Sequence, residues 1–264
     1  MHPFVPKAIA KRYDPANLCI YCGADRYVPG HNRGLTIEHI IPFGLNGELT
    51  LPRASCRRCE GVTGSDEQIL LRGVLLGCRT LLGLRTRKPK DRPNRLPLFD
   101  TEMTPNRKIM VDVEHYPANI LLIKNGPPPI LSGQPASQIG PWCCFFRNSS
   151  QIFRSRYGIA SYATPLLDTK TFNRVLGKVG HSFAVAELGR SGFHALLPHY
   201  IRDPDGDLSF FVGGASHTES PSTSLHEIDF EPPSAEHSYI VVRVRLFSFL
   251  GAPIYRVVIG IRDA

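Results

Sequence analysis

The chain has 264 residues, of which 42% are hydrophobic and 20% are charged, and it carries a formal net charge of +8. This composition is typical of a folded globular protein and excludes disorder over the whole chain. No apolar run approaches the roughly 18 residues that a membrane span needs, and the N-terminal residues show no signal-peptide pattern. We therefore expect a cytoplasmic protein without a membrane partner.

Positive charge is concentrated in the first part of the chain. Residues 1–100 carry 16 Lys and Arg against 9 Asp and Glu, whereas residues 101–264 carry 15 against 14. Neutralisation of phosphates by basic side chains supplies most sequence-independent affinity for nucleic acid. The charge pattern therefore favours a nucleic-acid partner for the N-terminal part, with a merely solvated basic surface as the alternative.

Two pairs of cysteines, Cys19-x-x-Cys22 and Cys56-x-x-Cys59, have the spacing of a four-thiolate zinc site. Four thiolates fill the tetrahedron and leave no open position for water, so the predicted zinc is structural. Disulfides are disfavoured because the seven cysteines are an odd number and no export signal is present. The other cysteines are interpreted as small buried side chains: Cys78, Cys143 and Cys144.

Between the two pairs, Glu38 and His39 are adjacent in a β-rich stretch. Neighbouring side chains of a regular strand point to opposite faces, so both can serve one site only where the strand ends or bends. Pro42, Gly44 and Gly47 follow closely and predict such a break.

Three motifs, Cys19-x-x-Cys22-Gly23, Glu38-His39-Ile40-Ile41-Pro42 and Cys56-x-x-Cys59-Glu60, together resemble the HNH nucleases. This is the His-Me finger or ββα-metal family, in its cysteine-bearing form, and the resemblance covers about residues 15–70. It implies a β-hairpin and a helix around one divalent ion, Mg²⁺ or Mn²⁺. It also implies that His39 is the general base and that Glu38 and Glu60 hold the ion.

The sequence departs from the family pattern at two places. Family members carry an Asn several residues before the second cysteine pair, but residues 49–55 contain none and Asn46 lies too early. Glu60 stands where the family usually has Asn or His, although a carboxylate is also a good ligand for Mg²⁺. His31 is an alternative metal ligand, and a plain loop histidine is the favoured interpretation because it has no partner at characteristic spacing.

Beyond the second cysteine pair, apolar spacing predicts a helix from about Asp66 to Leu82. Residues 85–95 then hold six basic residues and one acid, and their prolines predict an extended arm or a solvated linker. The side chains expected to contact phosphates are Arg53, Arg57, Arg58, Arg87, Lys88, Lys90 and Arg92.

The rest of the chain predicts a mixture of strands and one long helix. Residues 168–188 have a helical apolar face, with Asp168 or Thr169 as the N-cap. Strands are expected at 108–113, 119–123, 143–146 (buried), 239–250 and 254–261, the last two as a hairpin. A second site formed by His181, Glu187, His194 and His199 is disfavoured because their spacing matches no known metal pair.

These features predict an α+β protein in three segments. Residues 1–84 form a zinc-stapled ββα-metal domain, residues 85–104 a basic arm, and residues 105–264 a mixed α+β domain with a C-terminal hairpin. The predicted function is a metal-dependent HNH endonuclease that hydrolyses DNA. The alternatives are a zinc-stabilised nucleic-acid-binding module without cleavage activity, and a zinc-stabilised interaction protein whose function lies in the C-terminal segment.

Overall fold

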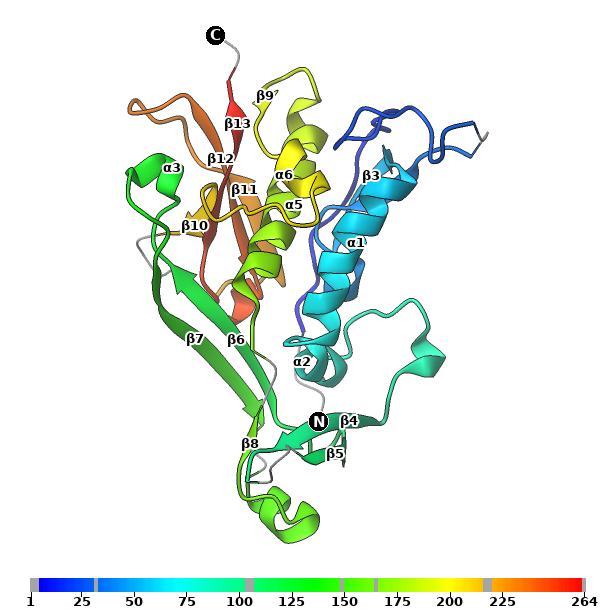
Figure 1. The fold of residues 1–264 in the computed structure, drawn as a ribbon, viewed down its shortest axis with the longest axis vertical. Helices are drawn as coiled ribbons and strands as arrows, with labels where there is room; N and C mark the ends of the chain where they lie inside the picture. Colours follow the sequence, from blue (N-terminus) through cyan, green and yellow to red (C-terminus); the bar gives the residue numbers. More distant parts are fainter. Residues whose placement is uncertain are drawn as a thin grey trace.

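In the computed structural model, helix α5 (Thr169–Leu188) runs between a C-terminal sheet and a group of elements from the N-terminal third of the chain (Figure 1). The structure describes residues 5–30, 33–102, 107–147, 150–163, 166–215 and 220–262. These residues form a mixed α+β fold with several small sheets. His31, the alternative metal ligand, lies outside them.

The N-terminal sheet has three strands in the order β1-β3-β2. Their bounds are Ala10–Arg12 for β1, Thr36–His39 for β2 and Glu48–Ser55 for β3. β1 is parallel to β3 and β2 is antiparallel to it, with His39 opposite Thr50 and a register shift between Thr36 and Glu38. The predicted strand end at Glu38 and His39 is therefore confirmed, and the short helix η1 (Phe43–Leu45) forms the turn into β3.

Helix α1 (Arg57–Arg72) starts directly after β3, and a shorter helix α2 (Leu76–Leu81) follows. The prediction of one helix from Asp66 to Leu82 was therefore wrong at its start and in its continuity. The start is earlier because extended Cys56 acts as the N-cap residue and Cys59 is buried, so tertiary contacts outweigh the low helix propensity of Gly61 and Gly64. The break lies at Gly73, whose φ of −92° and ψ of −114° are not helical.

We refer to β1, β2, β3, α1 and the four paired cysteines as the cysteine module.

Helix α5 confirms the predicted helix and its cap. The carboxylate of Asp168 accepts a hydrogen bond of 3.0 Å from the backbone N–H of Thr171. An apolar face that includes Phe172 and Val179 is buried against the C-terminal sheet. A side chain at Gly180 would come within 2.9 Å of Val257, so glycine there lets the helix approach the sheet closely.

The C-terminal sheet has the order β10-β13-β12-β11, with β9 also pairing with β13. The strands are β9 (His194–Ala195), β10 (Val212–Gly214), β11 (His226–Phe230), β12 (Tyr239–Leu246) and β13 (Tyr255–Ile261). β12 and β13 are the predicted hairpin, although residues 247–251 form a turn that contains η4 (Ser248–Leu250). Helix α6 (Pro198–Arg202) lies between β9 and β10 in the chain.

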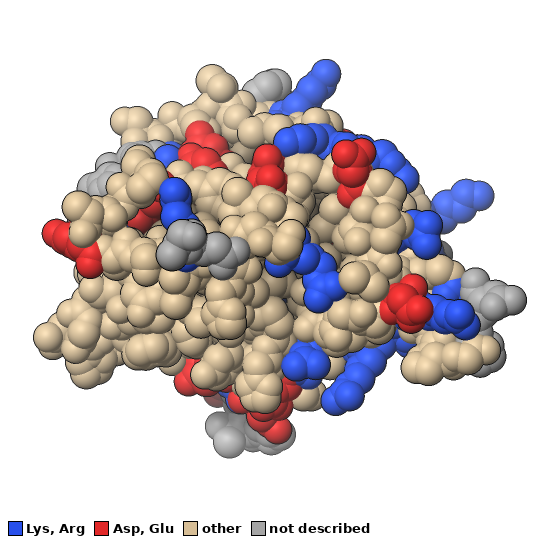
Figure 2. Space-filling view, turned by 90° about the horizontal axis from the view of Figure 1, so that it is seen from above, with Lys and Arg blue, Asp and Glu red and all other residues tan. Residues whose placement is uncertain are grey.

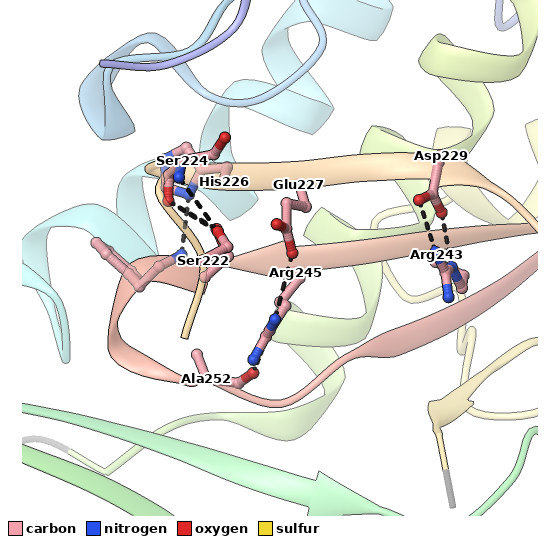
Figure 3. A network of polar contacts seen from close by, with 10 residues as sticks. Ser222, Ser224, His226, Glu227, Asp229, Arg243, Arg245 and Ala252 are labelled. Atoms are coloured by element: carbon pink, nitrogen blue, oxygen red, sulfur yellow. Dashed lines mark hydrogen bonds and ion pairs between the residues drawn. The ribbon is translucent and has the colours of Figure 1, made fainter. Parts of the chain in front are cut away.

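Charged pairs fix the register of β11 against β12 (Figure 3). Arg243 lies opposite Asp229 and binds both of its carboxylate oxygens at 2.7 Å. Arg245 lies opposite Glu227, at 3.3 Å, and its Nε also donates to the carbonyl of Ala252. Opposite charges in directly facing positions favour this register over a shifted one.

The remaining elements form two small sheets (Figure 1). β4 (Arg95–Asp100), β5 (Arg107–Asp112), β8 (Tyr162–Ala163), α4 (Ser150–Ile152) and η3 (Phe153–Tyr157) lie at the foot of the molecule. β6 (Ala118–Asn125) and β7 (Gln138–Arg147) form a hairpin that runs from the foot up to β10, where α3 (Pro129–Ser132) lies, and β6 contributes Ile120 and Leu122 to the main core. The predicted strands at 108–113 and 119–123 are confirmed. Residues 143–146 do lie in a strand, but the prediction that they are buried was wrong: Cys143 and Phe145 are exposed on the outward face of β7, and Cys144 and Phe146 are only partly buried. Of the three cysteines outside the pairs, only Cys78 is buried as expected.

The basic run at 85–95 is less extended than predicted. It contains a short helical turn, η2 (Pro89–Asp91), and its last residue begins β4. Arg85 pairs with Glu48, and Arg92 donates to the carbonyl of Leu84 at 2.6 Å. Two of its arginines are therefore tied to the body of the protein.

One continuous hydrophobic core runs from Tyr13 to Ile259 through the cysteine module, α5 and the C-terminal sheet. A second, smaller core joins β4 and β5 to Phe153 and Ile159. Whether the three predicted segments fold as separate domains stays a prediction. Over the residues that are described, no helix combines the length and apolar character required to span a bilayer.

His226 connects the C-terminal sheet to the turn after β2. Its Nε2 donates to the carbonyl of Leu45 at 2.7 Å, and its Nδ1 accepts from the backbone N–H of Phe247 at 3.0 Å. These partners require the neutral ring. Burial lowers the pKa of His226 to about 4.

Acidification should therefore destabilise the fold between pH 6.5 and pH 4. In this interval the unfolded His226 binds a proton and the folded one does not. Lowering the pH therefore lowers the free energy of unfolding, and His226 contributes up to roughly 3 kcal/mol of the change. Buried His181, whose pKa is also lowered to about 4, contributes in the same direction. Urea unfolding at a series of pH values measures this slope. His226→Gln should flatten it, whereas the exposed control His194→Gln should not, and equal slopes in the two variants would contradict the assignment.

Candidate metal centre and the adjoining basic groove

The four paired cysteines meet at one end of the cysteine module. Cys19 and Cys22 lie in the segment after β1, and Cys56 and Cys59 lie at the start of α1. All four sulfur atoms lie within 4.8 Å of one another, and those of Cys22 and Cys56 are 3.6 Å apart. A tetrahedral zinc with Zn–S bonds of about 2.3 Å requires sulfur atoms about 3.8 Å apart. The geometry thus fits one zinc ion.

Electrostatics favour a thiolate at one of the four cysteines. Hydrogen bonding from Cys59, supported by backbone N–H groups of Tyr21, Cys22 and Cys56, lowers the pKa of Cys19, whereas the same contact raises the pKa of Cys59 and burial raises that of Cys22. Thiolates are the form that binds zinc, so zinc binding would release the protons of the remaining thiols.

His39 ends β2 with its ring in edge contact with Phe43. Burial and the nearby charge of Lys178 lower the pKa of His39, so the imidazole is neutral at pH 7. Its Nδ1 is buried from solvent and has no hydrogen-bond partner among the described residues. A half-buried neutral imidazole of this kind can accept a proton, which is the chemistry expected of a general base.

Glu38, on the opposite face of β2, is buried and bonded to a lysine of α5. Its Oε1 lies 2.5 Å from Nζ of Lys178, which also lies 2.9 Å from Oε1 of Glu67 in α1. Burial raises the pKa of Glu38, and the ammonium opposes that effect. For Lys178 the two carboxylates outweigh burial and its pKa is raised, so the ammonium stays charged.

Glu60 has different partners. A carboxylate oxygen of Glu60 lies 3.3 Å from the hydroxyl of Thr36. The pKa of Tyr27 is raised, and the largest cause is its hydrogen bond to Glu60. Across the described part of the chain, the four cysteines are the only group of three or more His, Cys, Asp or Glu close enough to share an ion. That group includes neither Glu38 nor Glu60, and the divalent site expected at these two carboxylates stays a prediction.

The residues considered for a second site are not brought together. His181 is buried and bonds to the carbonyl of Ile20 at 2.9 Å, and Glu187 accepts from Tyr13 and Lys11. His194 and His199 lie in β9 and α6, both exposed. These four side chains thus serve separate structural contacts or face solvent.

A groove lies beside the cysteine cluster, and we call it the basic groove. Its volume is about 990 Å³, and it is lined by the segment around Tyr27, by one face of α1 from Arg57 to Ile69 and by the start of α5. Apolar side chains, including Val28, Val62 and Ile69, form much of its surface. Arg57, Arg58 and Lys170 line it too, and all three are exposed.

Two of the predicted phosphate contacts, Arg57 and Arg58, therefore lie in this groove. Arg53 is exposed on β3, and Arg87, Lys88, Lys90 and Arg92 are exposed in the basic run. In the view from above, Lys and Arg gather toward the side where Figure 1 places α1 and β3 (Figure 2).

Sequence reasoning missed Lys178, Glu67 and Lys170. Lys178 carried a signal, because it and Arg174 are four residues apart in a predicted helix whose neighbouring positions are apolar. Charged residues are almost never fully buried unless they are paired. The sequence could thus indicate that partners exist, although it could not name Glu38 and Glu67.

Comparison of the chain with protein-family models, with curated proteins and with solved structures finds no match to any of them.

We predict one zinc ion per chain and loss of both zinc and fold in Cys59→Ser, because a structural zinc contributes on the order of 10 kcal/mol to folding. Metal analysis and thermal unfolding monitored by circular dichroism measure these outcomes. The control is Cys143→Ser, which removes an exposed thiol outside the cluster. Wild-type protein that is free of zinc when purified without chelator would refute the assignment.

Proposed function

We propose that this chain is a zinc-stabilised nucleic-acid-binding protein that contacts its partner through the basic groove. The observation that carries the proposal is the position of Arg57, Arg58 and Lys170 on one apolar groove beside the cysteine cluster. In the described ranges none of the three side chains forms an ion pair. Their charges are therefore available to phosphates.

The composition of the groove suits a strand of nucleic acid. Cationic side chains on a groove can follow a phosphate backbone, while apolar and aromatic surface supports sugars and bases. Tyr27 adds an aromatic ring to the lining, with the guanidinium of Arg33 stacked 4.1 Å from its centre. The resemblance of the cysteine module to HNH nucleases favours DNA over RNA.

The local chain geometry explains why these cations lie together. Zinc at the four cysteines would hold the loop of residues 24–29 against the first turn of α1, which carries Arg57 and Arg58. The ion pair between Arg174 and Asp66, at 2.9 Å, holds α5 against α1 and so places Lys170 on the same groove. The shape of the binding surface would thus depend on the structural zinc.

Replacing Arg57, Arg58 and Lys170 together with Ala should weaken binding to all DNA sequences alike. The logarithmic salt slope should flatten by about 0.9 for each phosphate that the variant no longer neutralises. Fluorescence anisotropy with two unrelated duplexes over a salt series provides the measurement. The charge-matched control is Lys108→Ala with Lys124→Ala and Arg154→Ala, three positions outside the groove and the basic run, and it should change neither the affinity nor the salt slope.

The basic run is tested in parallel with Arg87→Ala, Lys88→Ala and Lys90→Ala. If these residues also track phosphates, this variant flattens the salt slope as the groove variant does. An unchanged slope assigns the run to a linker role. An unchanged slope in the groove variant would overturn the proposed function.

A metal-dependent HNH nuclease is the second candidate, and His39 favours it. Its neutral imidazole is the form that could take a proton from a water that attacks phosphorus. The ion pair between Lys178 and Glu38 argues against this mechanism, because it occupies a carboxylate that would have to bind the metal ion. We therefore place binding ahead of cleavage.

A plasmid-nicking assay with Mg²⁺ or Mn²⁺ separates the two candidates. We expect wild type and His39→Ala to bind plasmid equally and to leave it intact. A nuclease would instead nick the plasmid, and His39→Ala would lower the rate by about 10²–10⁴-fold without changing zinc content or affinity. That result would make cleavage the function and His39 its base.

A further inference from the structure

A buried cation with only oxygen neighbours lies where β2, α1 and α5 meet. Nζ of Lys178 is 2.5 Å from a carboxylate oxygen of Glu38 and 2.9 Å from one of Glu67. It also donates to the backbone carbonyls of His39 and of Ile40, the latter at 3.2 Å. The Lys178 side chain is only 2% exposed.

This set of neighbours is the kind that hard divalent cations use. Carboxylate and backbone carbonyl oxygens are typical ligands of Ca²⁺, which binds them at about 2.3–2.6 Å in flexible geometry. Here oxygens of this kind converge on one ammonium from the end of β2 and from α1. The two carboxylates carry negative charge that one lysine can only partly neutralise.

We propose that the ammonium of Lys178 takes the place of a divalent cation in the cysteine module. The module then carries its second cation as a side chain of α5, beside His39, and needs no bound metal at that position. Glu67 replaces Glu60 as the carboxylate of α1 that shares a cation with Glu38. This inference does not rest on nucleic-acid binding, because it follows from the contacts of Lys178 alone.

The placement of Lys178 has a mechanical consequence. It bonds to the last residue of β2 and to Ile40 just beyond it, and it also bonds to the side of α1. One side chain of α5 therefore fixes the angle between the strand end and the helix. A free metal ion in this position could be removed by a chelator, whereas the lysine cannot.

Removing the lysine should uncover the oxygen site. In Lys178→Ala the two carboxylates and two carbonyls remain, and the space vacated by the lysine chain can admit water ligands. We expect zinc-loaded Lys178→Ala to bind one Mn²⁺ per chain and wild type to bind none. Electron paramagnetic resonance of free Mn²⁺ measures binding, and zinc is quantified separately because thiolates select zinc over Mn²⁺.

Two control variants locate the bound ion. Lys178→Met fills the same space with an apolar chain and should bind no Mn²⁺. Lys178→Ala combined with Glu67→Gln removes one carboxylate from the oxygen site and should abolish the Mn²⁺ binding of Lys178→Ala. Binding that survives Glu67→Gln would place the ion elsewhere and overturn the proposal.

Lys178→Ala leaves the buried carboxylate of Glu38 and the partly buried one of Glu67 unpaired, which is strongly destabilising, so this variant could fail to fold without a metal. In that case Mn²⁺ or Ca²⁺ should restore its thermal unfolding transition, and neither should shift that of wild type. A variant that neither binds nor is restored by either ion contradicts the proposal. The proposal is also contradicted if wild-type protein binds Mn²⁺ and the Glu38→Gln variant does not.

Discussion

The arrangement of this protein depends on buried ion pairs between α5 and the cysteine module. Arg174 binds Asp66 at 2.9 Å and Lys178 binds Glu38 and Glu67, all from one side of a helix whose other side is apolar. Buried pairs add little stability compared with apolar contacts, but removing one partner costs roughly 3–5 kcal/mol. These pairs therefore select one orientation of the module on α5.

Zinc and α5 stabilise different parts of the cysteine module. The four cysteines can bind a zinc that joins the segment after β1 to the start of α1, at one end of the helix. Lys178 holds the end of β2, where it donates to the carbonyl of His39. The same ammonium pairs with Glu67, which lies farther along α1 than the cysteines. The basic groove begins beside the cysteines and extends along α1 to Ile69 and Arg174. A partner bound there would contact surface that both supports keep in place.

The sequence predicted those parts that depend on local spacing. The cysteine pairs, the cap of α5 at Asp168 and the C-terminal hairpin each have a short-range pattern, and the structure contains all three. Parts that depend on distant partners were missed. Lys178 is 139 residues from His39, whose carbonyl it bonds, and no local pattern records such a contact. The early start of α1 was missed for the same reason, because buried Cys59 outweighs two glycines.

The two cations of the cysteine module are thus expected to be one zinc ion and one lysine. Diffraction from crystals grown with Mn²⁺, measured at the zinc and manganese absorption edges, distinguishes this arrangement from one with two metal ions. We expect a single zinc peak among the four cysteines, no manganese peak, and Lys178 between Glu38 and Glu67. A manganese peak at Glu38, with Lys178 displaced from it, would show that the lysine does not replace a metal ion and would favour the metal-dependent nuclease.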